Sequence, residues 1–72
     1  MIDDERELIV KECFLEGIVA VCTKEDSVAE TSIKNLYWIT KGYIKQQHEY
    51  MKELSSGLYN SLTGFYKARG KE

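Results

Sequence analysis

The chain has 72 residues, no proline, two cysteines, one histidine and a net charge of −2, and these numbers exclude several classes of protein. A chain of this length forms one domain at most, buries only about 60% of its unfolded surface, and gains stability when it associates with another copy. No apolar stretch reaches the roughly 20 residues that cross a bilayer, and the acidic N-terminus is unlike a secretory signal. We therefore expect a cytoplasmic protein with no membrane partner.

The first predicted element is a helix over about residues 4–22. Asp3 and Asp4 mark its start, because their carboxylates can accept hydrogen bonds from the free amides of a first turn. Apolar residues lie on more than one side of this helix, which is typical of a helix in the middle of an assembly. Residues 17–23 are rich in β-branched side chains and could form a strand, but no second strand-like segment exists for pairing. We predict a helix, with the strand as the alternative.

The two cysteines, Cys13 and Cys22, lie nine residues apart, which places them on opposite faces of this helix and about 13 Å apart along its axis. They cannot form a disulfide with each other there, and the CxxC or HxxxH spacing of a zinc site is missing. We expect both to be small buried apolar side chains in a reducing compartment, with no metal and no cofactor.

Residues 23–26 are the one clear polar break, and a long helix over about residues 28–68 is predicted to follow it. Residues 27–30 (S-V-A-E) fit a capping box, in which the serine oxygen accepts from the third helical amide and the glutamate reaches back to the serine amide. Gly57, preceded by two serines, could end the long helix. The apolar spacing passes through Gly57 without a change of phase, so we predict one helix, with a kink or break near Gly57 as the alternative.

Apolar side chains at intervals of seven form a seam along this long helix: Tyr37, Ile44, Met51, Leu58 and Phe65. An interval of seven returns to nearly the same face of a helix, and an unbroken helix here would span roughly 60 Å. We predict that a second copy covers the seam. The predicted fold is all-α, a single domain over residues 1–72 built as a helical hairpin with a short first helix and a long second one, paired into a dimeric helical bundle. The predicted core and dimer residues are Ile33, Tyr37, Ile44, Met51, Leu54, Leu58, Leu62 and Phe65.

A second stripe of the long helix mixes cations with aromatic rings, and it contains four lysines and no acid. Such side chains can bind phosphate while rings stack on bases, or can anchor a protein interface. The alternative is a solvated face whose lysine stems cover the rings, or a face matched by the acidic first half of the chain. Residues 1–36 hold nine acids and four bases, whereas residues 37–72 hold three acids and six bases. The candidate partner-binding residues are Lys34, Trp38, Lys41, Lys45, His48, Lys52, Tyr59 and Tyr66.

Groups that could converge on a substrate are scarce, because His48 is the only histidine and no nucleotide-binding glycine motif occurs. Glu49 and Glu53 are four residues apart and could share a cation, but two ligands without a third are typical of an exposed helix face. We predict a non-enzymatic regulatory or inhibitory protein that binds another protein as a homodimer. The alternative is a helical dimer that binds nucleic acid or assists transcription through the lysine-aromatic stripe.

Overall fold

Three α-helices follow one another along the chain: α1 spans Ile2–Cys22, α2 spans Asp26–Lys45 and α3 spans Glu49–Gly70. The computed structural model describes residues 2–70, and the side chains of residues 4–69. Within residues 2–70 there is no strand, so residues 17–23 are not a strand. The prediction of an all-α fold is confirmed, as is the end of the first helix at Cys22.

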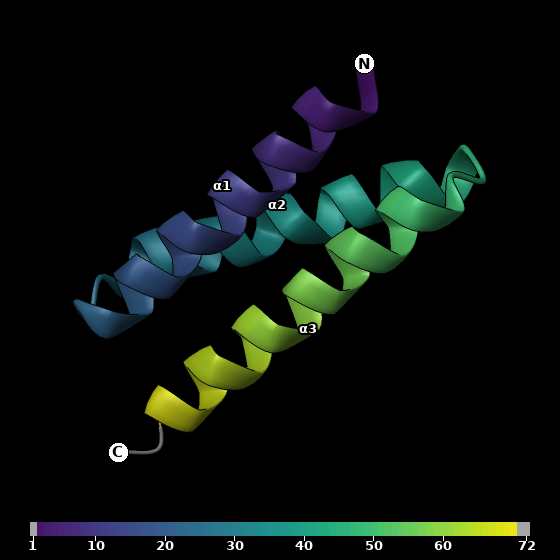
Figure 1. Cartoon of the computed structure of the whole chain (residues 1–72). Helices are drawn as coiled ribbons and strands as arrows, with labels where there is room; N and C mark the ends of the chain where they lie inside the picture. Colours follow the sequence, from purple (N-terminus) through teal and green to yellow (C-terminus); the bar gives the residue numbers. More distant parts are fainter. Residues whose placement is uncertain (1, 71–72) are drawn as a thin grey trace.

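The three helices pack against one another in a single bundle, in which each helix contacts both of the others (Figure 1). α2 runs antiparallel to α1, and α3 turns back to run in the same direction as α1 (Figure 1). The Cα atoms extend over 39 × 18 × 14 Å along the principal axes. None of the three helices is both long enough and apolar enough to cross a membrane, over the residues described.

The core lies between the helices and takes side chains from all three. The helices come close together at Gly17, where an added Cβ would lie 3.1 Å from the Cβ of Ser32 and would overlap the side chain of Leu62. Glycine allows the backbone of α1 to come this near to α2 and α3 because it carries no Cβ. The fully buried apolar residues are Val10, Ala20, Val21, Ala29, Leu36, Met51 and Leu62.

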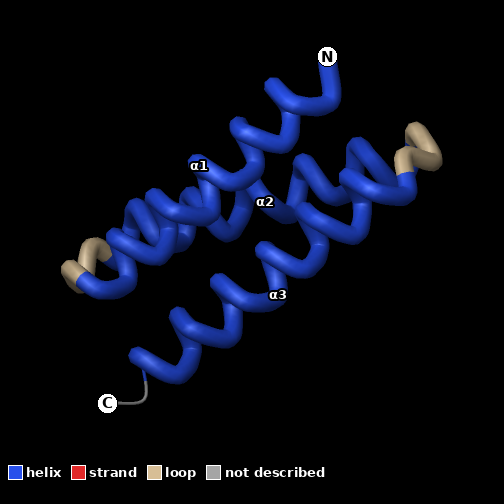
Figure 2. The backbone as a smooth tube through the Cα atoms, in the orientation of Figure 1, coloured by secondary structure: helices blue, strands red, loops and turns tan. Residues whose placement is uncertain are grey.

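The first turn closes α1 with the two hydrogen bonds of a Schellman motif. The N–H of Glu25 donates to the carbonyl of Ala20 at 2.8 Å, and the N–H of Lys24 donates to the carbonyl of Val21 at 3.2 Å. Lys24 has a φ of 62°, which is the left-handed conformation that glycine usually supplies at this position. The polar break predicted at residues 23–26 is therefore a tight helix-ending turn of residues 23–25 (Figure 2).

The second turn repeats the same motif at residues 46–48 (Figure 2). The N–H of His48 donates to the carbonyl of Tyr43 at 3.1 Å, and the N–H of Gln47 donates to the carbonyl of Ile44 at 3.2 Å. Gln47 has a φ of 57° and takes the place of the usual glycine. The rings of His48 and Tyr43 meet edge to face at 5.6 Å, which is the side-chain contact that often accompanies this motif.

This second turn shows that the prediction of one long helix over residues 28–68 is wrong. The chain reverses at residues 46–48. Gly57, where the alternative placed a kink or break, lies inside α3 instead. The predicted capping box at residues 27–30 is also wrong, because α2 already begins at Asp26 and its N-cap residue makes no side-chain cap hydrogen bond. The Ser27 carbonyl instead accepts a hydrogen bond from the Thr31 hydroxyl at 2.9 Å, inside the helix.

The reversal also divides the predicted seam. Met51 is fully buried and Leu58 is half-buried within the same molecule, because α3 folds back against α1 and α2. A second copy is therefore not needed to cover this part of the seam, and that argument for a dimer is wrong. Of the eight predicted core residues, Met51 and Leu62 are fully buried, Ile33, Leu54 and Leu58 are half-buried, and Tyr37, Ile44 and Phe65 are exposed.

Candidate partner-binding surface

The outer side of α2 carries a row of exposed cations: Lys34, Lys41 and Lys45. This side lies opposite the helix face buried in the core, since a helix turns by 100° per residue and these lysines fall about half a turn away from Leu36. Trp38 lies in the same row and is 68% exposed, the highest value among the large hydrophobic residues. These four candidates therefore lie on one exposed ridge of α2.

An aromatic cluster connects this ridge to α3. The ring of Tyr37 meets the ring of Trp38 edge to face at 5.5 Å and the ring of Tyr59 at 5.8 Å. The ammonium of Lys41 lies 5.2 Å from the centre of the Tyr37 ring, within the range of a cation–π interaction. We call Tyr37, Trp38, Lys41 and Tyr59 the lysine-aromatic patch. Tyr37, predicted as a core residue, is 39% exposed and is the residue that brings the other three together.

A groove between α2 and α3 lies on the same side of α2 as Tyr37. Thr40 and Ile44 follow Tyr37 by three and seven residues, and both line a cavity of about 370 Å³. The α3 side of this cavity includes Ser56 and Gly57, whose small side chains leave it open. Ile44 is 49% exposed beside it. The remaining lining residues are Lys52, Glu53 and Asn60.

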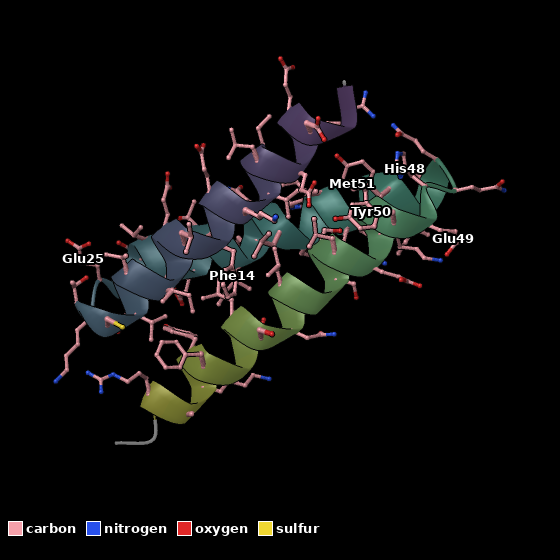
Figure 3. All side chains as sticks on the ribbon, viewed as in Figure 1. Phe14, Glu25, His48, Glu49, Tyr50 and Met51 are labelled. Atoms are coloured by element: carbon pink, nitrogen blue, oxygen red, sulfur yellow. The ribbon has the colours of Figure 1, made fainter. Side chains whose placement is uncertain are left out.

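The structure separates two of the predicted partner-binding residues from this patch. His48 lies in the second turn (Figure 3). Its ring meets the Tyr43 ring edge to face and completes the helix-ending motif. Tyr66 lines a different cavity, of about 360 Å³, together with Lys24 of the first turn and Arg69 near the end of α3. Removal from water raises the pKa of the Tyr66 hydroxyl, and the nearby carboxylates of Glu30 and Asp26 add to this. Lys52 remains at the groove, with its ammonium 3.1 Å from the Glu49 carboxylate.

The cysteines occupy different surroundings. Cys13 is half-buried, its thiol lies 3.5 Å from the carbonyl of Ser32, and burial raises the pKa of the thiol. Cys22 is exposed, so the prediction that it is buried is wrong. It lies at the end of α1, where the chain leaves the bundle for the first turn. Over the described part of the chain, no three His, Cys, Asp or Glu side chains come together as a metal site.

A second surface, on α1, was not singled out as a contact site from the sequence. The four most exposed apolar residues of α1 are Leu8 (56%), Ile9 (58%), Leu15 (58%) and Val19 (58%). Leu8, Leu15 and Val19 lie opposite Val10 and Gly17, which face the core, and Ile9 lies at the edge of this side, about 100° from Val10. In the sequence, apolar residues on more than one side of α1 indicated a central helix. In the single molecule, part of this apolar surface of α1 remains exposed.

Comparison of the chain with protein families, with curated proteins and with solved structures found no significant match.

Proposed function

We propose that this protein is a small non-catalytic regulatory or inhibitory protein, which acts by binding another protein through the lysine-aromatic patch and the α2–α3 groove. The observation that supports this most is the exposed cluster of aromatic rings around Tyr37. Tyrosine and tryptophan dominate the binding energy of protein interfaces, and charged residues at the rim fix the orientation of the partner. The small residues Ser56 and Gly57 leave room beside the cluster for a side chain of the partner.

The proposed partner presents an amphipathic helix to this groove. Its apolar side chains would contact Tyr37 and Ile44, and its acidic side chains would meet the ammonium groups of Lys41 and Lys45. A helix fits because the groove runs between two helices, and a fourth helix laid there would extend the bundle. Acidic flanks fit because both lysines are exposed on the α2 side of the groove.

A matched pair of variants tests this function. Tyr37→Ala removes a ring that is 39% exposed in the patch, and Phe65→Ala removes a ring that is 38% exposed on α3, away from the groove. A protein captured from the native host should be retained by the wild-type protein and by Phe65→Ala, and lost with Tyr37→Ala. With that protein purified, we expect Tyr37→Ala to weaken binding by at least about tenfold, which corresponds to about 1.4 kcal/mol. Equal binding by both variants would exclude the patch.

Nucleic-acid binding is the second candidate function, and the exposed row of Lys34, Lys41 and Lys45 with Trp38 favours it. The lysines would contact phosphates, and the Trp38 ring would stack on a base. Affinity for a single-stranded oligonucleotide should then fall steeply between 50 and 200 mM salt, because each neutralised phosphate releases a counterion. If Lys41→Glu combined with Lys45→Glu leaves binding at low salt unchanged, or if there is no binding at low salt, this function is excluded.

A further inference from the structure

The exposed side of α1 combines apolar residues with unpaired acids. Leu8, Ile9 and Val19 are each more than half exposed there. Glu5, Glu12 and Glu16 lie beside them at intervals of seven and four residues, so they form one acidic row along the helix. Among the described residues, none of these three glutamates takes part in an ion pair, whereas Glu7 pairs with Lys11 on the other side of α1. This face of α1 therefore has both uncovered apolar surface and uncompensated negative charge.

The outer side of α2 has the complementary composition. Val28 is 44% exposed, and Trp38 is exposed still further. Lys34 and Lys45 make no ion pair over residues 2–70, and Lys41 contacts only the ring of Tyr37. Opposite charges thus face water on the two helices of one molecule, although α1 and α2 pack against each other along their other sides.

α1 and α2 run antiparallel. Their contacts show which residue of α1 lies beside which residue of α2, that is, at the same level along the bundle axis. Gly17 lies beside Ser32, and Val19 and Val28 line one cavity of about 380 Å³. At the other end, a cavity of about 240 Å³ is lined by residues that include Arg6 and Gly42. Counting along the helices from these contacts gives the levels of the exposed residues. Ile9 lies at the level of Trp38, and Lys34 lies between the levels of Glu12 and Glu16.

We propose that two copies of this chain pair through the faces of α1 and α2 that point away from α3, with α1 of each copy against α2 of the other. A two-fold axis parallel to the helices produces this arrangement and keeps every residue at its own level. Ile9 then contacts the partner's Trp38, and Val19 contacts the partner's Val28. Glu12 and Glu16 of α1 meet Lys34 of the partner subunit. Each contact occurs twice, so the interface is closed and no filament forms.

Charge and apolar contact favour this pairing over contact of α1 with the partner's α1. Pairing the two α1 helices would bring the acidic rows together, and like charges at an interface are strongly unfavourable. Pairing α1 with the partner's α2 instead covers exposed apolar residues of both helices and sets the acidic row of α1 against Lys34 of the partner subunit.

The proposed dimer goes beyond the binding function above. It covers Trp38, and it leaves the α2–α3 groove open on each copy together with Tyr37, Lys41 and Tyr59. Trp38 lies at the boundary between the two surfaces, whereas Tyr37 and Tyr59 belong to the groove side. Tyr37→Ala should therefore leave dimerisation intact. A variant can therefore lose partner binding while it still forms the dimer, so the two proposals are tested separately.

Charge exchange tests the dimer. Sedimentation equilibrium of the wild-type protein should give a dimer, and Glu12→Lys should raise its dissociation constant at least about tenfold, because it places a lysine against the partner's Lys34. Adding Lys34→Glu to Glu12→Lys should restore the wild-type value. Glu53→Lys lies in the α2–α3 groove, outside the paired faces, so it is the matched control and should leave the dissociation constant of the dimer unchanged. A wild-type protein that stays monomeric at all concentrations, or a double variant weaker than Glu12→Lys, would overturn the proposal.

Cross-linking tests the pairing of the helices in a background of Cys13→Ala and Cys22→Ser. One preparation carries Glu12→Cys and another carries Lys34→Cys, so that a disulfide between them can form only between two molecules. Mixing the two under mild oxidation should give a covalent dimer, and Glu12→Cys alone should give little. A covalent dimer from Glu12→Cys alone would show that α1 pairs with α1, which overturns the arrangement. The far-ultraviolet circular dichroism of each variant should match that of the wild-type protein, since both positions are exposed.

Discussion

Leu62 on α3 occupies the space that a Cβ at position 17 of α1 would need. Leu62 is fully buried, so its side chain cannot move away freely. The Cβ of the buried Ser32 on α2 would also lie only 3.1 Å from the added Cβ. Alanine would favour the helix by about 1 kcal/mol, but overpacking a buried site costs about 1–3 kcal/mol. We expect Gly17→Ala to lower the free energy of unfolding by about 1 kcal/mol, measured by urea denaturation.

Gly57 provides the matched control for this substitution. It also lies in the middle of a helix, but an added Cβ would meet nothing within 4 Å. Gly57→Ala should therefore raise the free energy of unfolding by about 0.5–1 kcal/mol, through helix propensity alone. Opposite signs for the two glycine variants are expected, and equal signs would show that α1 does not approach α2 and α3 at position 17.

Met51 and Ile44 test the three-helix packing directly. They are successive members of the seven-residue seam, yet Met51 is fully buried and Ile44 is 49% exposed. Met51→Ala should lower the free energy of unfolding by about 2–5 kcal/mol because it leaves a cavity. Ile44→Ala should cost less than half as much, since much of its side chain already faces water. A long unbroken helix would instead make the two substitutions nearly equal in urea denaturation.

Gln47 should be replaceable by glycine with a gain in stability. Its φ of 57° is unfavourable for a residue with a Cβ by roughly 1–2 kcal/mol, and glycine removes this strain while losing some entropy. Gln47→Gly should raise the thermal midpoint by a few degrees. Gln46→Gly is the control, because Gln46 has a φ of −85° and gains nothing from glycine. If both variants lower the midpoint, the left-handed conformation at position 47 is excluded.

The hydrogen bond from the Tyr50 hydroxyl to the Glu7 carboxylate, at 2.7 Å, joins α3 to α1 and should make stability depend on pH. The bond from Tyr50 lowers the pKa of Glu7 below 4.5, with a further effect of Lys11, and the same bond raises the pKa of Tyr50 above 10.0. The Glu7 contribution is therefore complete above about pH 4.5 and is lost as the pH falls through the lower folded pKa. The Tyr50 contribution is complete below about pH 10 and is lost as the pH rises through the higher folded pKa.

Carboxyl chemical shifts measured by NMR during a pH titration can check this link. In Tyr50→Phe, the pKa of Glu7 should rise towards its ordinary value, and it should stay below that value because Lys11 still lies 3.2 Å from the carboxylate. The ring of Tyr50 is retained in this variant, so packing changes little. An unchanged Glu7 pKa in Tyr50→Phe would contradict the hydrogen bond.

The helical nature of the chain could be predicted from its sequence, but the reversal at residues 46–48 could not. Turns are normally recognised by glycine or proline, and here Gln47 takes the left-handed position that glycine usually holds. Gly57 carried the alternative prediction of a break, but it lies inside α3 with open space around it. The first turn was recognisable only because charged residues surround Lys24, which also takes the left-handed conformation without being a glycine.

The candidate surface was predictable where helical spacing alone decides it. The row from Lys34 to Lys45 lies on one side of α2 in any straight helix, and the structure places it there. The contact between Tyr37 and Tyr59 was not predictable, since it depends on how α3 folds back after the second turn. The exposed apolar side of α1 was not identified as a contact surface for the same reason. The spacing of apolar residues shows which sides of α1 are apolar, but it does not show which of these sides the other helices cover.

The shared direction of α1 and α3 determines how the fold would respond to tension. The described chain enters the bundle at one end and leaves it at the other, so a pull on both ends acts along the 39 Å axis (Figure 1). Such a force slides α1 past α3 lengthwise, and it loads the whole contact between them at once. The molecule should therefore resist stretching as one unit and then extend in a single step.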